Sequence, residues 1–316
     1  MRSSLPPRPP ALPRGFLPVV QVAFTANNQL DLAAVRRLIE DAIAAGANGF
    51  LVPAVASEVG FLEPAERVAL VETVLDSTQS RVPVVLGISD TTPARCLAHA
   101  RAAAALPVTA HLAAVPPEFY ARENEVPAFF AEICTGLDTP LIVQDLQFNG
   151  PGLSSPILSA LIELPGIAGF KIETVPAGPK YTQLRGLGGA RCWIAGGWAV
   201  PQMIEALDRG VDALVPECSM IRVYKAIERL HRRGNRAEAI ALFRELLPVL
   251  AFTNQEISTS VAFFKRLLAR KGIFSSVAQR MPLPHWDETT ECVAHELIAH
   301  YIRLETSLGG PDAVTP

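Results

Sequence analysis

Short apolar runs alternate with segments of helical spacing along most of the chain. The runs are rich in Val and Ile and lack regular polar alternation, which is typical of strands buried on both faces of a parallel sheet. The predicted strands are residues 17–22, 49–52, 82–87, 108–114, 140–144, 167–171, 191–195 and 213–215. The predicted helices between and after them are residues 32–44, 64–78, 93–105, 126–137, 154–164, 179–187, 201–209 and about 220–232.

Eight strand–helix units in succession predict an α/β protein with a (β/α)8 TIM barrel over residues 15–232. The main alternative is a doubly wound open sheet. That fold would favour a glycine-rich phosphate loop after the first strand, whereas residues 23–27 read AFTAN.

The remaining segments predict no second enzyme domain. Helical spacing at 236–251, 254–271 and 285–306 indicates a C-terminal helical extension over residues 233–306. Residues 1–14 contain five prolines and no periodicity, so we expect a disordered arm there, and a similar tail over 307–316.

Composition excludes several classes of partner. The 28 Lys and Arg residues against 31 Asp and Glu give a net charge of −3, which offers no electrostatic case for nucleic acid or an anionic membrane. No apolar run approaches the roughly 20 residues of a spanning helix, and no secretory signal is evident. The five cysteines are scattered along the chain, which disfavours a disulfide framework or a zinc site. His295 and His300 are five residues apart, whereas the two zinc ligands of a zinc-protease helix are four apart. We therefore expect a cytoplasmic protein without a metal site.

Lys171 is the first candidate for chemistry. It ends the apolar strand of residues 167–171, and the catalytic residues of such barrels lie where strands end. A desolvated lysine has a lowered pKa and an unprotonated, nucleophilic amine, as imine formation with a carbonyl compound requires. The alternative is a structural ion pair with Glu173 or Glu58.

Several short motifs, in order and spacing, resemble the dihydrodipicolinate synthase / N-acetylneuraminate lyase family over about residues 15–283. They are GFLP at 15–18, AGANG at 45–49, SE at 57–58 followed by Leu62 and ER at 66–67, RVPVVLG at 81–87, GFKIE at 169–173, GG at 196–197 and RMPL at 280–283. The resemblance implies that Lys171 forms the imine and that Gly196 or Gly197 contacts substrate. It also implies a homotetramer or homodimer, in which an aromatic loop at residues 116–120 reaches a neighbouring subunit.

The chain departs from this family at positions that carry its chemistry. Val55 and Ala56 replace two hydroxyl residues that bind the substrate carboxylate and relay protons, although Ser57 supplies a hydroxyl one position later. Gln144 stands in place of the strand-5 tyrosine, and Asn149 in place of a carboxylate-binding arginine. Glutamine is neither an acid nor a base near pH 7. These departures disfavour lysine biosynthesis.

We therefore expect a Schiff-base lyase or aldolase that acts on a small 2-oxo acid through an imine on Lys171, without a further cofactor. Dehydration of a 2-keto-3-deoxy sugar acid is an alternative. The backbone N–H groups of Ala56 and Ser57, with the Ser57 hydroxyl, are expected to hold the substrate carboxylate. The other residues expected around the cavity, among them the candidate proton shuttles, are Glu58, Tyr120, Gln144, Asp145, Glu173, Gly196 and Gly197.

A different class of function stays open at this point. The lost tyrosine and the Val55–Ala56 pair also fit a non-catalytic barrel that binds a small metabolite, with Lys171 as an anion contact. Covalent trapping of a 2-oxo acid on Lys171 distinguishes the two hypotheses.

Overall fold

The structure is a computed structural model of the chain, and it describes residues 12–198 and 200–309. The predicted tail from 310 onward and the first 11 residues of the predicted arm lie outside the described residues. Residues 12–14 of that arm are placed against the base of the barrel. Leu12 packs on the barrel interior, Trp193 Nε1 donates a hydrogen bond to Pro13 O at 2.9 Å, and Arg14 pairs with Asp212 at 2.8 Å. The prediction of disorder is therefore wrong for these three residues.

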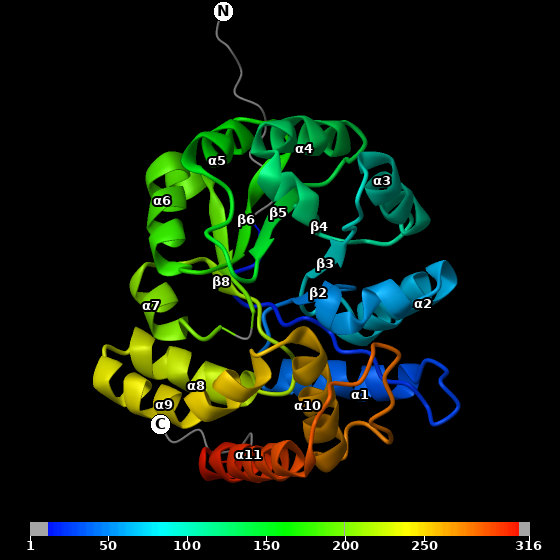
Figure 1. Cartoon of the computed structure of the whole chain (residues 1–316), viewed down its shortest axis with the longest axis vertical. Coiled ribbons are helices and arrows are strands. Elements are labelled where there is room, and N and C mark those ends of the chain that lie inside the picture. The colour runs from blue at the N-terminus through cyan, green and yellow to red at the C-terminus, as the bar shows by residue number, and fades with distance from the viewer. Residues whose placement is uncertain (1–11, 199, 310–316) are drawn as a thin grey trace, which may run out of the picture.

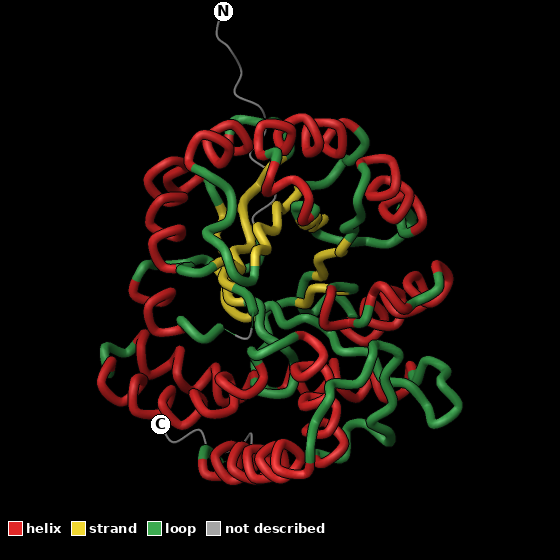
Figure 2. Tube along the Cα trace, viewed as in Figure 1, coloured by secondary structure: helices red, strands yellow, loops and turns green. Residues whose placement is uncertain are grey.

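Eight parallel strands form a single curled sheet with helices around it, the predicted TIM barrel (Figures 1 and 2). The strands are β1 (Gly15–Phe16), β2 (Phe50–Val52), β3 (Val84–Gly87), β4 (Ala110–Ala114), β5 (Leu141–Gln147), β6 (Ile167–Thr174), β7 (Trp193–Gly196) and β8 (Ala213–Leu214). Their order is β1-β8-β7-β6-β5-β4-β3-β2. Val19, three residues after β1, closes the barrel, because it bridges Leu51 of β2 at the other end of this order as well as Glu217 after the neighbouring β8.

The helices of the barrel follow the predicted segments closely. They are α1 (Leu32–Ala44), α2 (Pro64–Thr78), α3 (Pro93–Ala102), α4 (Val126–Thr135), α5 (Ser155–Ile162), α6 (Gly178–Gly188), α7 (Met203–Asp208) and α8 (Ile221–Arg232). Local chemistry sets their starts. The Asp31 carboxylate accepts a hydrogen bond from Ala34 N at 2.9 Å and caps α1, while Pro64 occupies the first position of α2.

Three predicted strands differ from the structure by more than two residues at one end. The first strand is β1 at Gly15–Phe16 rather than residues 17–22, where Pro18 has no N–H to donate and only Val19 makes a bridge. Strands β5 and β6 run three residues further than predicted, to Gln147 and Thr174. Polar residues fit in these extensions because successive side chains face opposite sides of the sheet.

The C-terminal extension consists of α9 (Arg236–Thr253), α10 (Ile257–Arg270) and α11 (Glu288–Ser307). Figure 1 shows these three helices gathered beside α1 and α8, on one side of the barrel. Helix α10 reaches the barrel mouth, where its residues Ile257, Ser260 and Phe264 line a cavity. In the part of the chain that the structure describes, no helix combines the length and apolarity that crossing a membrane requires.

Candidate active site

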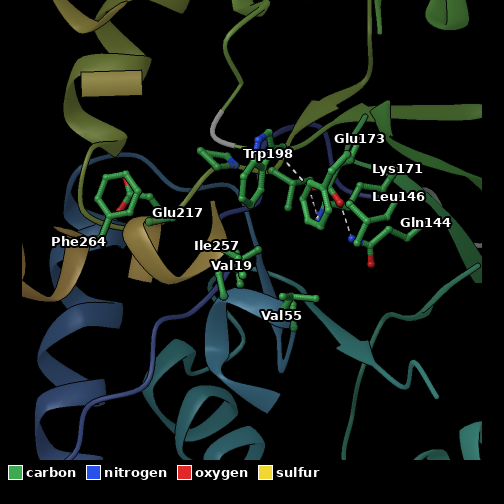
Figure 3. A pocket seen from close by; sticks show the side chains of 16 residues that line it. Val19, Val55, Gln144, Leu146, Lys171, Glu173, Trp198, Glu217, Ile257 and Phe264 are labelled. Carbon is green, nitrogen blue, oxygen red and sulfur yellow. Dashed lines mark hydrogen bonds and ion pairs between the residues drawn. The ribbon is translucent and has the colours of Figure 1, made fainter. Parts of the chain in front are cut away.

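Lys171 lies inside the barrel and lines a small cavity at its mouth (Figure 3). The side chain is buried, and its Nζ lies 3.0 Å from Glu173 Oε1. Both residues belong to β6 and are separated by one position, so the pleat directs both side chains to the barrel interior. The structure thus contains the ion pair considered for Lys171, and it places that pair within the cavity.

Glu173 is held by three donors. Its Oε1 accepts a hydrogen bond from Trp198 N at 2.7 Å and pairs with Lys171 Nζ. Its Oε2 accepts a hydrogen bond from Gln144 Nε2. Gln144 is the register partner of Lys171 across β5 and β6, so the two side chains lie in one layer of the barrel. The carboxylate is therefore fixed between the lysine amine and the amide that replaces the family's tyrosine.

Gly196 and Gly197 leave space for neighbouring functional groups. A Cβ at Gly197 would lie 2.3 Å from Glu173 Oε1 and 2.6 Å from Lys171 Cε. A Cβ at Gly196 would lie 2.5 Å from the hydroxyl of Tyr181 in α6. Gly197 thus lies against the Lys171–Glu173 pair and lines a neighbouring cleft, whereas Gly196 faces Tyr181 and does not line the Lys171 cavity.

The turn after β2 forms another wall of the cavity. Val55 and Ala56 line it, at the start of the single turn η1 (Val55–Ser57). The first N–H groups of such a turn have no acceptor within it, so they are available to a bound anion. Ser57 is not available as predicted. Its hydroxyl donates to Val20 O at 2.6 Å and accepts from Ala54 N, and its own N–H donates to Ala54 O.

Glu58 does not line the Lys171 cavity, contrary to the prediction. It has a left-handed backbone with φ of 53°, which turns its side chain toward the C-terminal extension. There the buried carboxylate pairs with Lys265 of α10 and accepts hydrogen bonds from Arg280 N and Met281 N, both at 2.7 Å. Its role is to attach the RMPL segment and α10 to the turn that carries Val55 and Ala56.

Tyr120 and Asp145 also lie away from the cavity. Asp145 follows Gln144 in β5, so its side chain faces the opposite side of the sheet. It accepts a hydrogen bond from the Tyr120 hydroxyl at 2.9 Å and lies 3.9 Å from Lys180 Nζ. Burial raises the pKa of Asp145, and the nearby Lys180 opposes that shift. These residues form a buried cluster behind the barrel wall and not a proton shuttle at Lys171.

The aromatic loop after β4 packs on its own chain. The Phe119 ring lies 5.2 Å from that of Phe129 in α4, and Tyr120 is partly buried against Asp145. Both rings are half-buried, so contacts within the chain cover them only in part.

Several residues of the cavity were not singled out in the sequence. They are Val19, Leu146, Phe148, Trp198, Val215, Glu217 and the three residues of α10. Glu217 follows β8 and is buried, and burial raises its pKa while hydrogen bonds from Gln21 and Ser219 oppose the shift. Alternation along β5 points to Leu146, two residues after Gln144, but nothing in the sequence of α10 indicates that it reaches the cavity.

This arrangement places one primary amine, two carboxylates (Glu173 and Glu217) and one amide around a small, largely apolar space. An amine next to a carboxylate can lose its proton and attack a carbonyl carbon. Among the described residues, no three His, Cys, Asp or Glu side chains are grouped so that they could hold a metal ion.

Comparison with known proteins gives matches over nearly the whole chain. The model of the Dihydrodipicolinate synthetase family matches residues 12–300. An L-2-keto-3-deoxyarabonate dehydratase of Azospirillum brasilense is 31% identical over 313 residues, which cover 96% of this chain and 97% of that protein.

Solved structures show the same fold. A dihydrodipicolinate synthase from Rhodopseudomonas palustris has a TM-score of 0.82 at 20% identity, covering 91% of this chain and 97% of that one. A sialic acid aldolase of Ruminococcus gnavus has a TM-score of 0.83 at 17% identity, covering 93% and 98%. At these identities the likeness concerns the barrel and not the reaction.

Proposed function

Because the chain belongs to the dihydrodipicolinate synthetase family, we propose that it is a lyase whose Lys171 amine forms an imine with the ketone of a small 2-oxo acid. The observation that carries this proposal is the buried Lys171 Nζ inside the barrel mouth, 3.0 Å from the Glu173 carboxylate. A buried lysine beside a proton acceptor is suited to nucleophilic attack.

Imine formation uses the two residues in sequence. Glu173 accepts a proton from Nζ, and the neutral amine attacks the C2 ketone carbon. The ketone oxygen takes up the proton held by Glu173 and a second proton from the nitrogen and leaves as water, so that a protonated C=N bond and an ionised Glu173 remain. The protonated imine is itself the electron sink, so the reaction needs no dissociable cofactor.

The substrate carboxylate is best placed against the turn after β2. The N–H groups of Val55 and Ala56 open this turn and line the cavity, while Ser57 is occupied by bonds within the protein. The amide of Gln144 then orients the water or the hydroxyl group nearest to Glu173.

Among the reactions open to such an imine, we favour loss of water from a 2-keto-3-deoxy sugar acid. Removal of one C3 proton gives an enamine. The enamine expels the C4 hydroxyl, which takes up one proton and leaves as water, and hydrolysis of the imine restores Lys171. In this proposal Glu173 removes the first proton and returns it to the leaving oxygen. The name of the Azospirillum brasilense relative supports this choice.

Product analysis tests the reaction type. The protein is incubated with a 2-keto-3-deoxypentonate, and the products are separated by chromatography and mass spectrometry. Dehydration predicts a product that is 18 mass units lighter, by the loss of one water. Formation of pyruvate and a two-carbon aldehyde would indicate aldol cleavage through the same imine. Binding without turnover or adduct would support the non-catalytic barrel.

We further propose that the protein assembles as a homotetramer or homodimer, as its family commonly does. The support is family membership.

A further inference from the structure

We propose that a cleft next to the Lys171 cavity binds the uncharged, hydroxyl-bearing end of the substrate, with Thr174 and Asn254 as its polar contacts. This inference rests on the proposed function, and it names the part of the substrate that extends beyond the imine.

The cleft is large and adjoins the reaction centre. The Lys171 cavity has a volume of about 50 Å³, which suits the three-carbon head of a 2-oxo acid. The neighbouring cleft has a volume of about 420 Å³, and Phe148, Glu173 and Trp198 line both spaces. A substrate longer than its 2-oxo acid head therefore finds room on the far side of these three residues. Figure 3 shows Trp198 and Glu173 at the edge of the smaller cavity.

Two residues that line the cleft each carry a buried polar side-chain atom without a partner. Thr174 ends β6 with only 3% of its surface exposed, and its Oγ1 makes no hydrogen bond. The Oδ1 of Asn254, just after α9, is likewise buried without a donor, although the Nδ2 of that residue donates to Trp198 O at 3.2 Å. Buried polar atoms without partners cost free energy, so such positions indicate a ligand that supplies the missing bonds.

The charge of the cleft selects the class of ligand. Among the described residues that line it, Glu173 is the only charged one, and its carboxylate is already held by Lys171 and Trp198. No lysine or arginine of the described lining is present to bind a carboxylate or phosphate. The unpartnered Oδ1 requires a donor, and Oγ1 either donates or accepts. A hydroxyl group meets both requirements, and the Leu247 and Leu250 side chains offer an apolar wall to the carbon chain.

The test compares three 2-oxo acids that share the same head. Pyruvate has no tail, 2-oxopentanoate has an apolar tail, and a 2-keto-3-deoxypentonate has a hydroxylated tail. Half-saturating concentrations are measured by borohydride trapping and, without borohydride, by saturation-transfer NMR. The variants are Thr174→Val, Thr174→Ser and Asn254→Leu, with Thr289→Val on the exposed face of α11 as the matched control.

Thr174→Val and Asn254→Leu should each raise the half-saturating concentration of the hydroxylated acid about three- to tenfold, as loss of one hydrogen bond implies. Pyruvate and 2-oxopentanoate should be unaffected, Thr174→Ser should retain wild-type affinity, and Thr289→Val should change nothing. Equal changes for all three acids, or none, would overturn the inference. If the wild-type protein forms no adduct with any acid, the imine proposal fails, and the NMR comparison still decides whether the cleft recognises hydroxyl groups.

Discussion

A methyl group added at Gly197 should disable Lys171 while leaving the fold intact. The Cβ of Gly197→Ala would lie 2.3 Å from Glu173 Oε1 and 2.6 Å from Lys171 Cε, whereas ordinary contact begins at 3.4 Å. The two atoms must therefore move by about 1.1 Å and 0.8 Å, from 3.4 − 2.3 and 3.4 − 2.6. Such movement pulls the carboxylate away from the amine.

The functional cost should exceed the structural one. A misplacement of about 1 Å at a reaction centre can lower a rate by about 100-fold. Overpacking costs about 1–3 kcal/mol, and the lower end applies here because the displaced atoms belong to side-chain ends. The assay is the rate at which pyruvate plus borohydride adds its reduced three-carbon mass to the protein, together with the free energy of unfolding in urea.

The matched control is Gly186→Ala in α6. No atom lies within 4 Å of a Cβ at that position, so the variant should trap pyruvate at the wild-type rate and gain up to about 1 kcal/mol of stability from helix propensity. If Gly197→Ala also traps at the wild-type rate while folding normally, the Lys171–Glu173 contact is not required for imine formation.

Other predictions address chemistry, stability and assembly. Glu173→Gln should lower turnover by about 10²- to 10⁴-fold, because an amide cannot accept or donate the proton. Gln144→Ala should lower turnover by about 10²-fold or less. Steady-state kinetics compares the two variants, and equal losses would contradict their different roles. Burial lowers the pKa of His111 from 6.5 to about 4. Between pH 6.5 and pH 4, His111 is therefore protonated in the unfolded chain but neutral in the folded protein. Stability present above pH 6.5 should fall by about 3 kcal/mol as the pH drops to 4, and urea titrations of His111→Gln should lack that component. Glu58→Gln should destabilise the protein by about 3–5 kcal/mol, because the Lys265 ammonium stays buried without the Glu58 carboxylate. Adding Lys265→Met to this variant should recover part of the lost stability. Equal unfolding free energies for wild type and Glu58→Gln would refute this prediction. Light scattering at micromolar concentration should report a dimer or tetramer, and a monomer would contradict the proposed assembly.

The barrel could be predicted from the sequence because its signals are local. Apolar runs and helical spacing recur along the chain, and the starts of α1 and α2 are fixed by Asp31 and Pro64 at the positions predicted. The short β1 was missed, since its closure of the sheet depends on bridges from Val19 to residues far along the chain. Such pairing leaves no mark in local periodicity.

The site was only partly predictable for the same reason. The inward placement of Gln144 and Lys171 follows from the register of β5 and β6, and Glu173 follows from the two-residue pleat. The same pleat excludes Asp145, which shares a strand end with Gln144 but has its side chain on the opposite face of the sheet. Glu58 was misplaced because its left-handed backbone and its partner Lys265, about 200 residues away, are features of tertiary structure.

The central claim is that Lys171 forms the imine, and peptide mapping of the trapped adduct tests it most directly. The protein is incubated with pyruvate and borohydride and then digested, and the modified peptide is sequenced by mass spectrometry. We predict one reduced three-carbon adduct, on Lys171, and none in Lys171→Arg, because a guanidinium stays protonated and cannot form the imine. An adduct on another lysine such as Lys180, or undiminished trapping in Lys171→Arg, would contradict the account.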